Sequence, residues 1–299
     1  MSFTFDTAVF YESQGEAVAR AFVVAAPHEV VASDELATWR LEGRIVGPTC
    51  RYSSTLQARI PLAHRGLTTW GDRMALLAEA AVPDPCPWST ELPFLYRAVG
   101  DVVVGPTTRA AFEQPFGLRR LSIVRRKIAL EGRLWVPRVV RREAVVEPAP
   151  LQSWRTADTA LFVDDPDETL CRAADETGVV LFARAPQPVD DRNAALRRYG
   201  THPSIAVVEL PAAAHDPATA NLARNTLVAY GCDSDTAVPP GAPRIVELTP
   251  AETFVPAAEA PLFIRRTLTT VGTLVEARAA CDRLQADLAG KCDAAGFIV

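Results

Sequence analysis

The pattern of apolar and polar positions changes near residue 115 of this 299-residue chain. Before that point, short segments of strand length alternate partly between apolar and polar residues, and glycine and proline separate them. The clearest segments are Ala21–Ala25, Thr38–Leu41, Thr55–Ile60, Leu76–Val82 and Leu95–Val104. Many short strands separated by turns are typical of two packed antiparallel sheets. We therefore predict an all-β sandwich for residues 1–115.

A transitional segment follows, with the sequence FGLRRLSIVRRKIALEGRLWVPRVVRRE over residues 116–143. Apolar residues alternate with polar ones on both sides of the basic bend at residues 125–127, which predicts a hairpin. Glu131-Gly132 predicts a tight turn, because glycine tolerates positive φ. The run Leu134–Arg141 is large and branched, as expected for a strand that is buried on both faces and ends in solvent.

From Glu143 onward, short apolar runs alternate with amphipathic stretches. With Leu134–Arg141 as the first, eight strands are expected; the others are Thr159–Val163, Val179–Ala183, Ser204–Leu210, Thr226–Tyr230, Arg244–Leu248, Leu262–Leu268 and Gly296–Val299. Helices are expected between them over residues 167–177, 189–199, 217–225 and 273–288. Strand–helix alternation with eight strands predicts a compact (β/α)₈ barrel of the TIM type for residues 116–299.

The amino-acid composition limits which kinds of partner and cofactor we expect for this protein. The net charge of −5 argues against a nucleic-acid partner. No apolar run reaches the roughly 18 residues of a membrane helix, and the N-terminus lacks the pattern of a signal peptide. The six cysteines and four histidines show no metal-ligand spacing, so we expect free thiols, no metal and no cofactor. These features predict a cytoplasmic protein.

Four short motifs resemble glycoside hydrolase family 2. PCPWSTELPFLY at residues 85–96 resembles the family segment LWSPExPxLY, and FGLR at 116–119 resembles FGxR. RRE at 141–143 resembles the terminal RHE of the first barrel strand, and HPSI at 202–205 resembles the start of HPSxxxWSxxNE. The resemblance implies an immunoglobulin-like sandwich followed by a TIM barrel. It also implies that Trp88, Phe94 and Tyr96 are core or edge residues of the sandwich.

The resemblance also implies where the catalytic carboxylates should stand, and this chain has other residues there. The acid/base position falls on Ala213 and the nucleophile position, at the end of strand seven, on Arg266. Arg184 and Asp164 stand where the family has a glutamate and a histidine. Retaining glycosidases need two carboxyl groups, and a guanidinium cannot replace one. The resemblance, with these replacements, therefore implies a barrel that lacks the family's hydrolytic chemistry.

Charged residues remain at the expected strand ends, which gather at the mouth of a barrel. They are Arg141, Glu143, Asp164, Asp165, Arg184, Glu209, Asp233, Glu247 and Arg266. Because a buried guanidinium needs a partner, we predict that Arg266, or else Arg265, pairs with Glu209, Glu247, Asp164 or Glu143. The family alignment favours Arg266. His202 is expected to lie at the opposite end of the barrel, in a structural role.

Three functions stay open, and whether the protein is an enzyme is not decided at this point. The first is a pseudo-glycosidase that binds a carbohydrate, a small anion or a protein at the barrel mouth. The second is an active hydrolase that uses Glu209 and Glu247 instead, because each follows an apolar run that would raise its pKa. The third is a structural protein that assembles with a partner chain or with itself.

Overall fold

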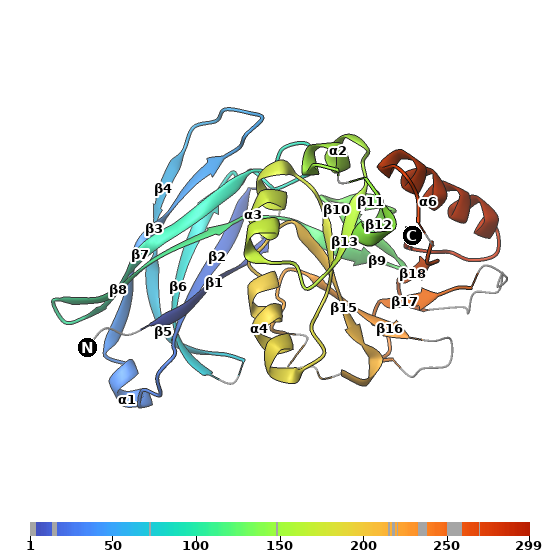
Figure 1. Ribbon diagram of the computed structural model, residues 1–299. Helices are drawn as coiled ribbons and strands as arrows, with labels where there is room; N and C mark the ends of the chain where they lie inside the picture. The colour runs from blue at the N-terminus through green and yellow to red at the C-terminus, as the bar shows by residue number, and fades with distance from the viewer. Residues whose placement is uncertain are drawn as a thin grey trace. The chain divides into compact units, whose positions relative to one another are not determined.

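The computed structural model describes residues 4–13, 17–71, 73–147, 149–214, 216, 219, 221–232, 238–249, 259–268 and 270–299. The chain divides into two compact units. The first consists of Met1–Leu118 and Gly200–Pro203, and the second of Arg119–Tyr199 and Ser204–Val299. Figure 1 shows the elements of both units in chain order.

The first unit is a sandwich of two antiparallel four-stranded sheets. One sheet has the order β1 (Phe5–Ser13), β2 (Val18–Pro27), β6 (Arg73–Pro83) and β5 (Ala63–Trp70). The other has the order β4 (Ala58–Pro61), β3 (Trp39–Thr49), β7 (Leu95–Val104) and β8 (Thr107–Phe116), and a short helix, α1 (Ser33–Leu36), precedes β3. The sequence therefore predicted the architecture of this unit correctly, although it missed β1, β5 and β8.

The core of the sandwich lies between the inner faces of its two sheets. Tyr96 stacks on Phe116 with ring centroids 5.6 Å apart, and its hydroxyl accepts a hydrogen bond from the Cys86 backbone at 2.9 Å. Trp88 and Phe94 are also buried. The motif at residues 85–96 thus provides packing residues, as the sequence analysis predicted.

The second unit contains a closed barrel of eight parallel strands. In order these are β12 (Arg138–Arg141), β13 (Ala160–Asp164), β14 (Leu181–Arg184), β15 (Ile205–Pro211), β16 (Leu227–Cys232), β17 (Arg244–Glu247), β18 (Leu262–Arg265) and β19 (Gly296–Ile298). The connecting helices are α2 (Leu151–Thr156), α3 (Glu168–Thr177), α4 (Val189–Tyr199) and α6 (Leu274–Leu288), with short 3₁₀ turns η1 (Arg142–Ala144) and η2 (Ala212–Ala214). The predicted eight-stranded barrel is confirmed.

One predicted strand is wrong in its extent. The run Leu134–Arg141 splits at Pro137, since proline has no N–H to donate to a sheet. Its first part is β11 (Arg133–Trp135), which joins β10 (Lys127–Leu130) and β9 (Leu121–Val124) in a separate three-stranded sheet. Glu131 and Gly132 form the predicted turn between β10 and β11, and both have positive φ.

Local signals explain the helix ends. The Asp167 carboxylate accepts a hydrogen bond from the Leu170 backbone at the start of α3, and Gly178 ends that helix with φ of 79°. Thr273 and Glu276 form a reciprocal capping box at the start of α6. The predicted helices at 167–177, 189–199 and 273–288 are confirmed to within a residue or two at each end. The predicted helix at 217–225 falls partly outside the described residues.

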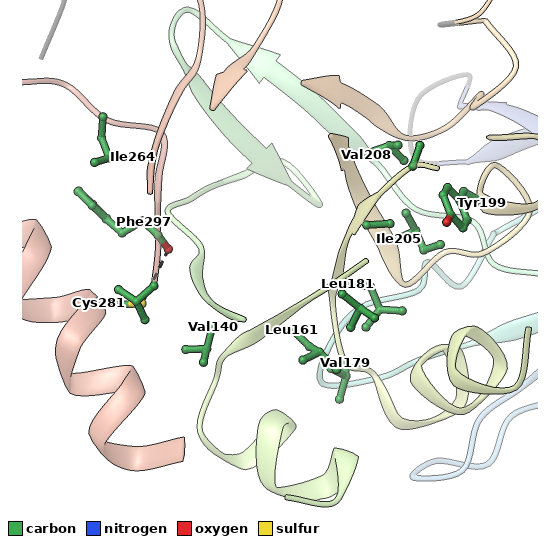
Figure 2. Close-up of a cluster of buried hydrophobic side chains, with 14 of the residues drawn as sticks. Val140, Leu161, Val179, Leu181, Tyr199, Ile205, Val208, Ile264, Cys281 and Phe297 are labelled. Atoms are coloured by element: carbon green, nitrogen blue, oxygen red, sulfur yellow. Dashed lines mark hydrogen bonds between the residues drawn. The ribbon is translucent and has the colours of Figure 1, made fainter. Parts of the chain in front are cut away.

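The barrel has an outer and an inner layer of apolar side chains. The outer layer lies between strands and helices, and Figure 2 shows Val140, Leu161, Leu181 and Ile264 in it together with Cys281 of α6. Burial raises the pKa of the Cys281 thiol to about 12, so this cysteine is an inert packing group. In the inner layer, Phe182 lies edge-on to Phe263 at 5.4 Å.

Replacing Phe182 by alanine should destabilise the barrel more than any surface change. Phe182 is buried and contacts both Phe263 and Trp135, with a centroid distance of 6.4 Å to the latter. We expect Phe182→Ala to lower the free energy of unfolding by about 3–5 kcal/mol. Val275→Ala on the exposed face of α6 is the matched control and should change it by less than about 0.5 kcal/mol. Urea unfolding followed by tryptophan fluorescence checks both values.

Candidate functional site at the barrel mouth

Charged side chains stand at the C-terminal ends of the barrel strands, and the strand register brings opposite charges together. Asp164 on β13 lies beside Arg184 on β14, and Arg184 lies beside Glu209 on β15. On the far side of the barrel, Glu247 on β17 lies beside Arg265 on β18. In a barrel these ends face one cavity, so charges from distant parts of the sequence can meet across it.

The centre of the site is the Glu209 carboxylate, which is only 5 % exposed. Arg265 Nη1 donates to both of its oxygens at 2.9 Å. Arg184 contacts Oε2 from the adjacent strand, with Nε at 3.2 Å and Nη2 at 3.1 Å. Each oxygen of this buried carboxylate therefore faces at least one guanidinium, which is the condition for keeping it charged away from water.

Arg265 also joins Glu209 to a second carboxylate. Its Nε donates to Glu247 Oε2 at 3.1 Å, and the Thr267 hydroxyl donates to the other oxygen of Glu247. Burial by itself would raise the pKa of Glu247, but the hydrogen bond from Thr267 and the charges of Arg265 and Arg141 outweigh it, so that this pKa is lowered. Glu247 is therefore an ionised acceptor at neutral pH.

The opposite half of the mouth continues the same pattern. Arg184 Nη1 lies 3.3 Å from Asp164, and Arg141 lies 3.8 Å from both Asp164 and Glu143. The guanidinium groups of Arg141 and Arg184 lie over the ring of Phe162, at 5.7 and 5.2 Å from its centroid. We call the seven residues Arg141, Glu143, Asp164, Arg184, Glu209, Glu247 and Arg265 the mouth network.

Part of the mouth network lines a cavity of about 470 Å³. The other lining residues are Gln187, Pro211, Ala212, Ala213, Gly231 and Cys232. Ala213 lies in η2 directly after β15, where the family resemblance expects the acid/base. A Cβ atom at position 231 would lie 2.5 Å from Glu209 Oε1, so a larger residue than Gly231 would push this carboxylate from its present position.

Arg266, the predicted mouth residue of strand seven, points away from the cavity. Phe263 faces the barrel interior and Ile264 the outer layer, so alternation turns Arg265 inward and Arg266 outward. Arg266 Nη1 lies 3.4 Å from Asp287 of α6. The alignment of strand seven was therefore one residue off: it rested on Pro261 and a run of apolar residues, which carry no register of their own.

Other predicted residues lie apart from the cavity or outside the described residues. Asp165 accepts hydrogen bonds from Arg198 and from the Tyr199 hydroxyl, at 2.9 and 2.7 Å. His202 is buried, precedes the start of β15, and is not among the residues that line the mouth cavity. Asp233 lies outside the described residues. Within the described ranges, no cluster of three or more histidine, cysteine or acidic side chains is placed to hold a metal, and no helix there is long and apolar enough to cross a membrane.

Solved structures with a similar fold include two β-glucuronidases and a member of glycoside hydrolase family 2. A Bifidobacterium dentium β-glucuronidase matches 99% of this chain with a TM-score of 0.61 at 13% identity, and the match covers 60% of that protein. A Bacteroides uniformis β-glucuronidase matches 98% of this chain with a TM-score of 0.59 at 13% identity, over 45% of its own length. A family 2 member from Bacteroides cellulosilyticus matches 78% with a TM-score of 0.55 at 15% identity, over 35% of its length.

These identities establish similarity of fold alone. The chain spans between 35% and 60% of the length of the three solved proteins. No family model matches the sequence, and no curated protein matches it either. The coarse resemblance found in the motifs is therefore supported at the level of architecture.

Arginine substitutions should distinguish the role of Arg265, the last residue of β18, from that of Arg266, which follows it. Arg265→Ala leaves the buried Glu209 with Arg184 as its remaining arginine in the mouth network, and we expect a loss of about 3 kcal/mol in unfolding free energy. Arg266→Ala, the matched control, removes an ion pair with an exposed aspartate and should cost about 1 kcal/mol or less. Denaturant unfolding of both variants measures the difference, and equal losses would contradict the inward placement of Arg265.

The lowered pKa of Glu247 predicts a pH dependence of stability. A carboxyl group whose pKa is lower in the folded state stabilises the protein above its unfolded pKa, and that contribution disappears as pH falls through the folded value. Glu247→Gln should therefore flatten the decline in melting temperature below about pH 4.3, the ordinary pKa of a glutamate. Exposed Glu35→Gln on α1 is the control and should leave the slope unchanged.

Proposed function

We propose that this protein is a family 2 glycosidase-like scaffold without hydrolytic activity, which binds a carbohydrate or a protein. The observation that carries the proposal is the pairing of Glu209 with Arg184 and Arg265 at the barrel mouth. A glycosidase keeps its carboxyl groups available to the sugar, one as proton donor and one as nucleophile or base. Here the most buried carboxylate of the mouth network is held by two arginines instead.

The residues at the two family positions support the same conclusion. Ala213 has no proton to give, and the inward side chain at the end of β18 is Arg265, which stays positively charged at every physiological pH. Glu247 has a lowered pKa and is hydrogen-bonded to Thr267 and Arg265, so it is a poor proton donor at neutral pH. Loss of either catalytic group alone would reduce turnover by orders of magnitude.

The charge balance of the mouth bears on what could bind there. Three guanidinium groups face four carboxylates in the mouth network, and each arginine already contacts at least two of them. A small anion would have to compete with Asp164 and Glu209 for Arg184. The network therefore supports a neutral carbohydrate better than an anion. A partner protein or a second copy of the chain is the alternative occupant, and light scattering with and without oligosaccharide separates these cases.

A second candidate function is an active hydrolase that uses Glu209 and Glu247. One observation favours it: both carboxylates line the same cavity and contact the same guanidinium, Arg265. Because the Glu209 and Glu247 carboxylates both bind the guanidinium of Arg265, they lie close to each other, and a glycosidase also needs two carboxyl groups close together. For this function Arg265 would have to move aside when substrate binds.

A panel of aryl glycosides, including a glucuronide, tests the proposal. We expect the wild-type protein to release no aryl alcohol above the buffer rate. Glu247→Gln removes one of the two alternative acids at a site that is 46 % exposed on the side chain, so the variant should fold. Turnover by the wild type that disappears in Glu247→Gln would refute the proposal and establish the second function.

A further inference from the structure

The barrel unit has another cavity, of about 350 Å³, on the outer side of its wall. Three parts of the unit line it: Leu161 of β13, the helices α2 and α3, and the connection between β12 and α2 (Figure 1). Leu161 belongs to the outer apolar layer, and the described residues that line this cavity include none of those that line the mouth cavity. We call this cavity the wall pocket.

The inner end of the wall pocket is apolar. Trp154 and Leu161 line it and are buried, with exposures of 3 % and 2 %. Three more lining residues are partly buried and pack against the same core cluster: Val145, Leu151 and Leu170. Trp154 Nε1 donates to the Ala149 carbonyl at 3.3 Å, so the indole ring needs no other polar partner. A lining of this kind favours an apolar group over water, and the volume is in the range of small-molecule pockets.

The rim of the wall pocket carries one positive and one negative side chain. Arg142 and Glu147 both line the pocket and are exposed. Neither side chain forms an ion pair or a hydrogen bond with another residue in the part of the chain that the structure describes. In the mouth network, by contrast, each arginine already contacts at least two carboxylates. The two charges of the rim are therefore available to a ligand.

Backbone hydrogen bonds hold the rim in place. The Val145 N–H donates to the Arg142 carbonyl at 3.3 Å and closes the turn η1. Residues three apart in a 3₁₀ turn lie on the same side, so Arg142 stands on the side on which Val145 packs against the core. The Glu147 N–H donates to the Gly272 carbonyl at 3.2 Å, which ties this part of the connection to the residues before α6. The charged groups thus belong to an anchored segment of the chain.

We propose that the wall pocket binds a free α-amino acid with a large apolar side chain, such as phenylalanine. Its carboxylate pairs with Arg142, its ammonium group pairs with Glu147, and its side chain enters the apolar end beside Trp154. An α-amino acid has both charges on the carbon that bears the side chain, so one small molecule satisfies the rim and the interior together. This site is separate from the mouth network and goes beyond the function proposed above.

Ligands with a single charge fit this pocket less well. An aryl carboxylate could pair with Arg142 but would bring a second negative charge to the rim that holds Glu147. An aryl amine would pair with Glu147 and would be repelled by Arg142 in the same way. An uncharged apolar molecule would fill the interior without either ion pair.

Calorimetry and saturation-transfer NMR on the full chain test this with L-phenylalanine, 3-phenylpropionate and 2-phenylethylamine. The second compound lacks the ammonium group of phenylalanine and the third lacks its carboxylate. We expect L-phenylalanine to bind with a Kd on the order of 1 mM or lower. Each of the two analogues should bind at least tenfold more weakly, because each loses one charge-assisted contact.

Two variants assign the charges to their residues. Arg142→Gln should weaken binding of L-phenylalanine about tenfold and should not weaken binding of 2-phenylethylamine. Glu147→Gln should weaken binding of L-phenylalanine to a similar extent and should not weaken binding of 3-phenylpropionate. Both residues are exposed, so the variants should keep the wild-type melting temperature. Arg283→Gln, at an exposed position of α6 that does not line the pocket, is the control and should leave Kd unchanged.

A third variant tests the apolar end. Leu170→Trp places a larger side chain in the pocket and should abolish binding of all three compounds, whereas Val275→Trp on the exposed face of α6 should not. The proposal is overturned if L-phenylalanine does not bind, or if either analogue binds as tightly. Binding of L-phenylalanine that survives Arg142→Gln, Glu147→Gln or Leu170→Trp would place the amino acid elsewhere and would overturn it as well.

Discussion

The pairing of Glu209 with Arg265 and Arg184 is the constraint on which the barrel mouth depends. A carboxylate as buried as Glu209 is stable only if cations face it, and β14 and β18 both supply one. Gly231 on β16 leaves space for that carboxylate in its present position, because a Cβ atom there would contact Glu209 Oε1. Four of the eight strands are therefore tied to a single carboxyl group, and Glu247 and Asp164 extend the pattern to their neighbours.

The ion pairs at the mouth mean that the barrel fold alone does not tell what chemistry this protein carries out. The barrel has the architecture of solved family 2 glycosidases, at 13–15% identity. A barrel collects strand ends into one cavity whatever those ends contain, so the fold accommodates an ion-pair network as readily as a catalytic pair. Function therefore has to be argued from the mouth residues, and in this chain they satisfy each other.

Local sequence signals were sufficient for most elements. The caps Asp167 and Thr273 and the stop at Gly178 define helix ends through contacts within four residues, so they can be read without the fold. Short apolar runs between those helices marked all eight barrel strands, because strands covered on both faces are apolar throughout. Apolar runs do not always mark where a strand ends. The run from Leu134 continues through Pro137, but the structure has two strands there, β11 before the proline and β12 after it.

The sequence by itself determined the order and kind of the elements, the buried aromatic motif at residues 85–96, and which charged residues end the strands. Tertiary structure decided which of those charges meet. Leu262, Phe263 and Ile264 are all apolar because both faces of β18 are buried, so nothing in the sequence distinguished an inward Arg265 from an inward Arg266. The contact between Glu209 and Arg265 joins residues 56 apart, and only closure of the barrel brings them together.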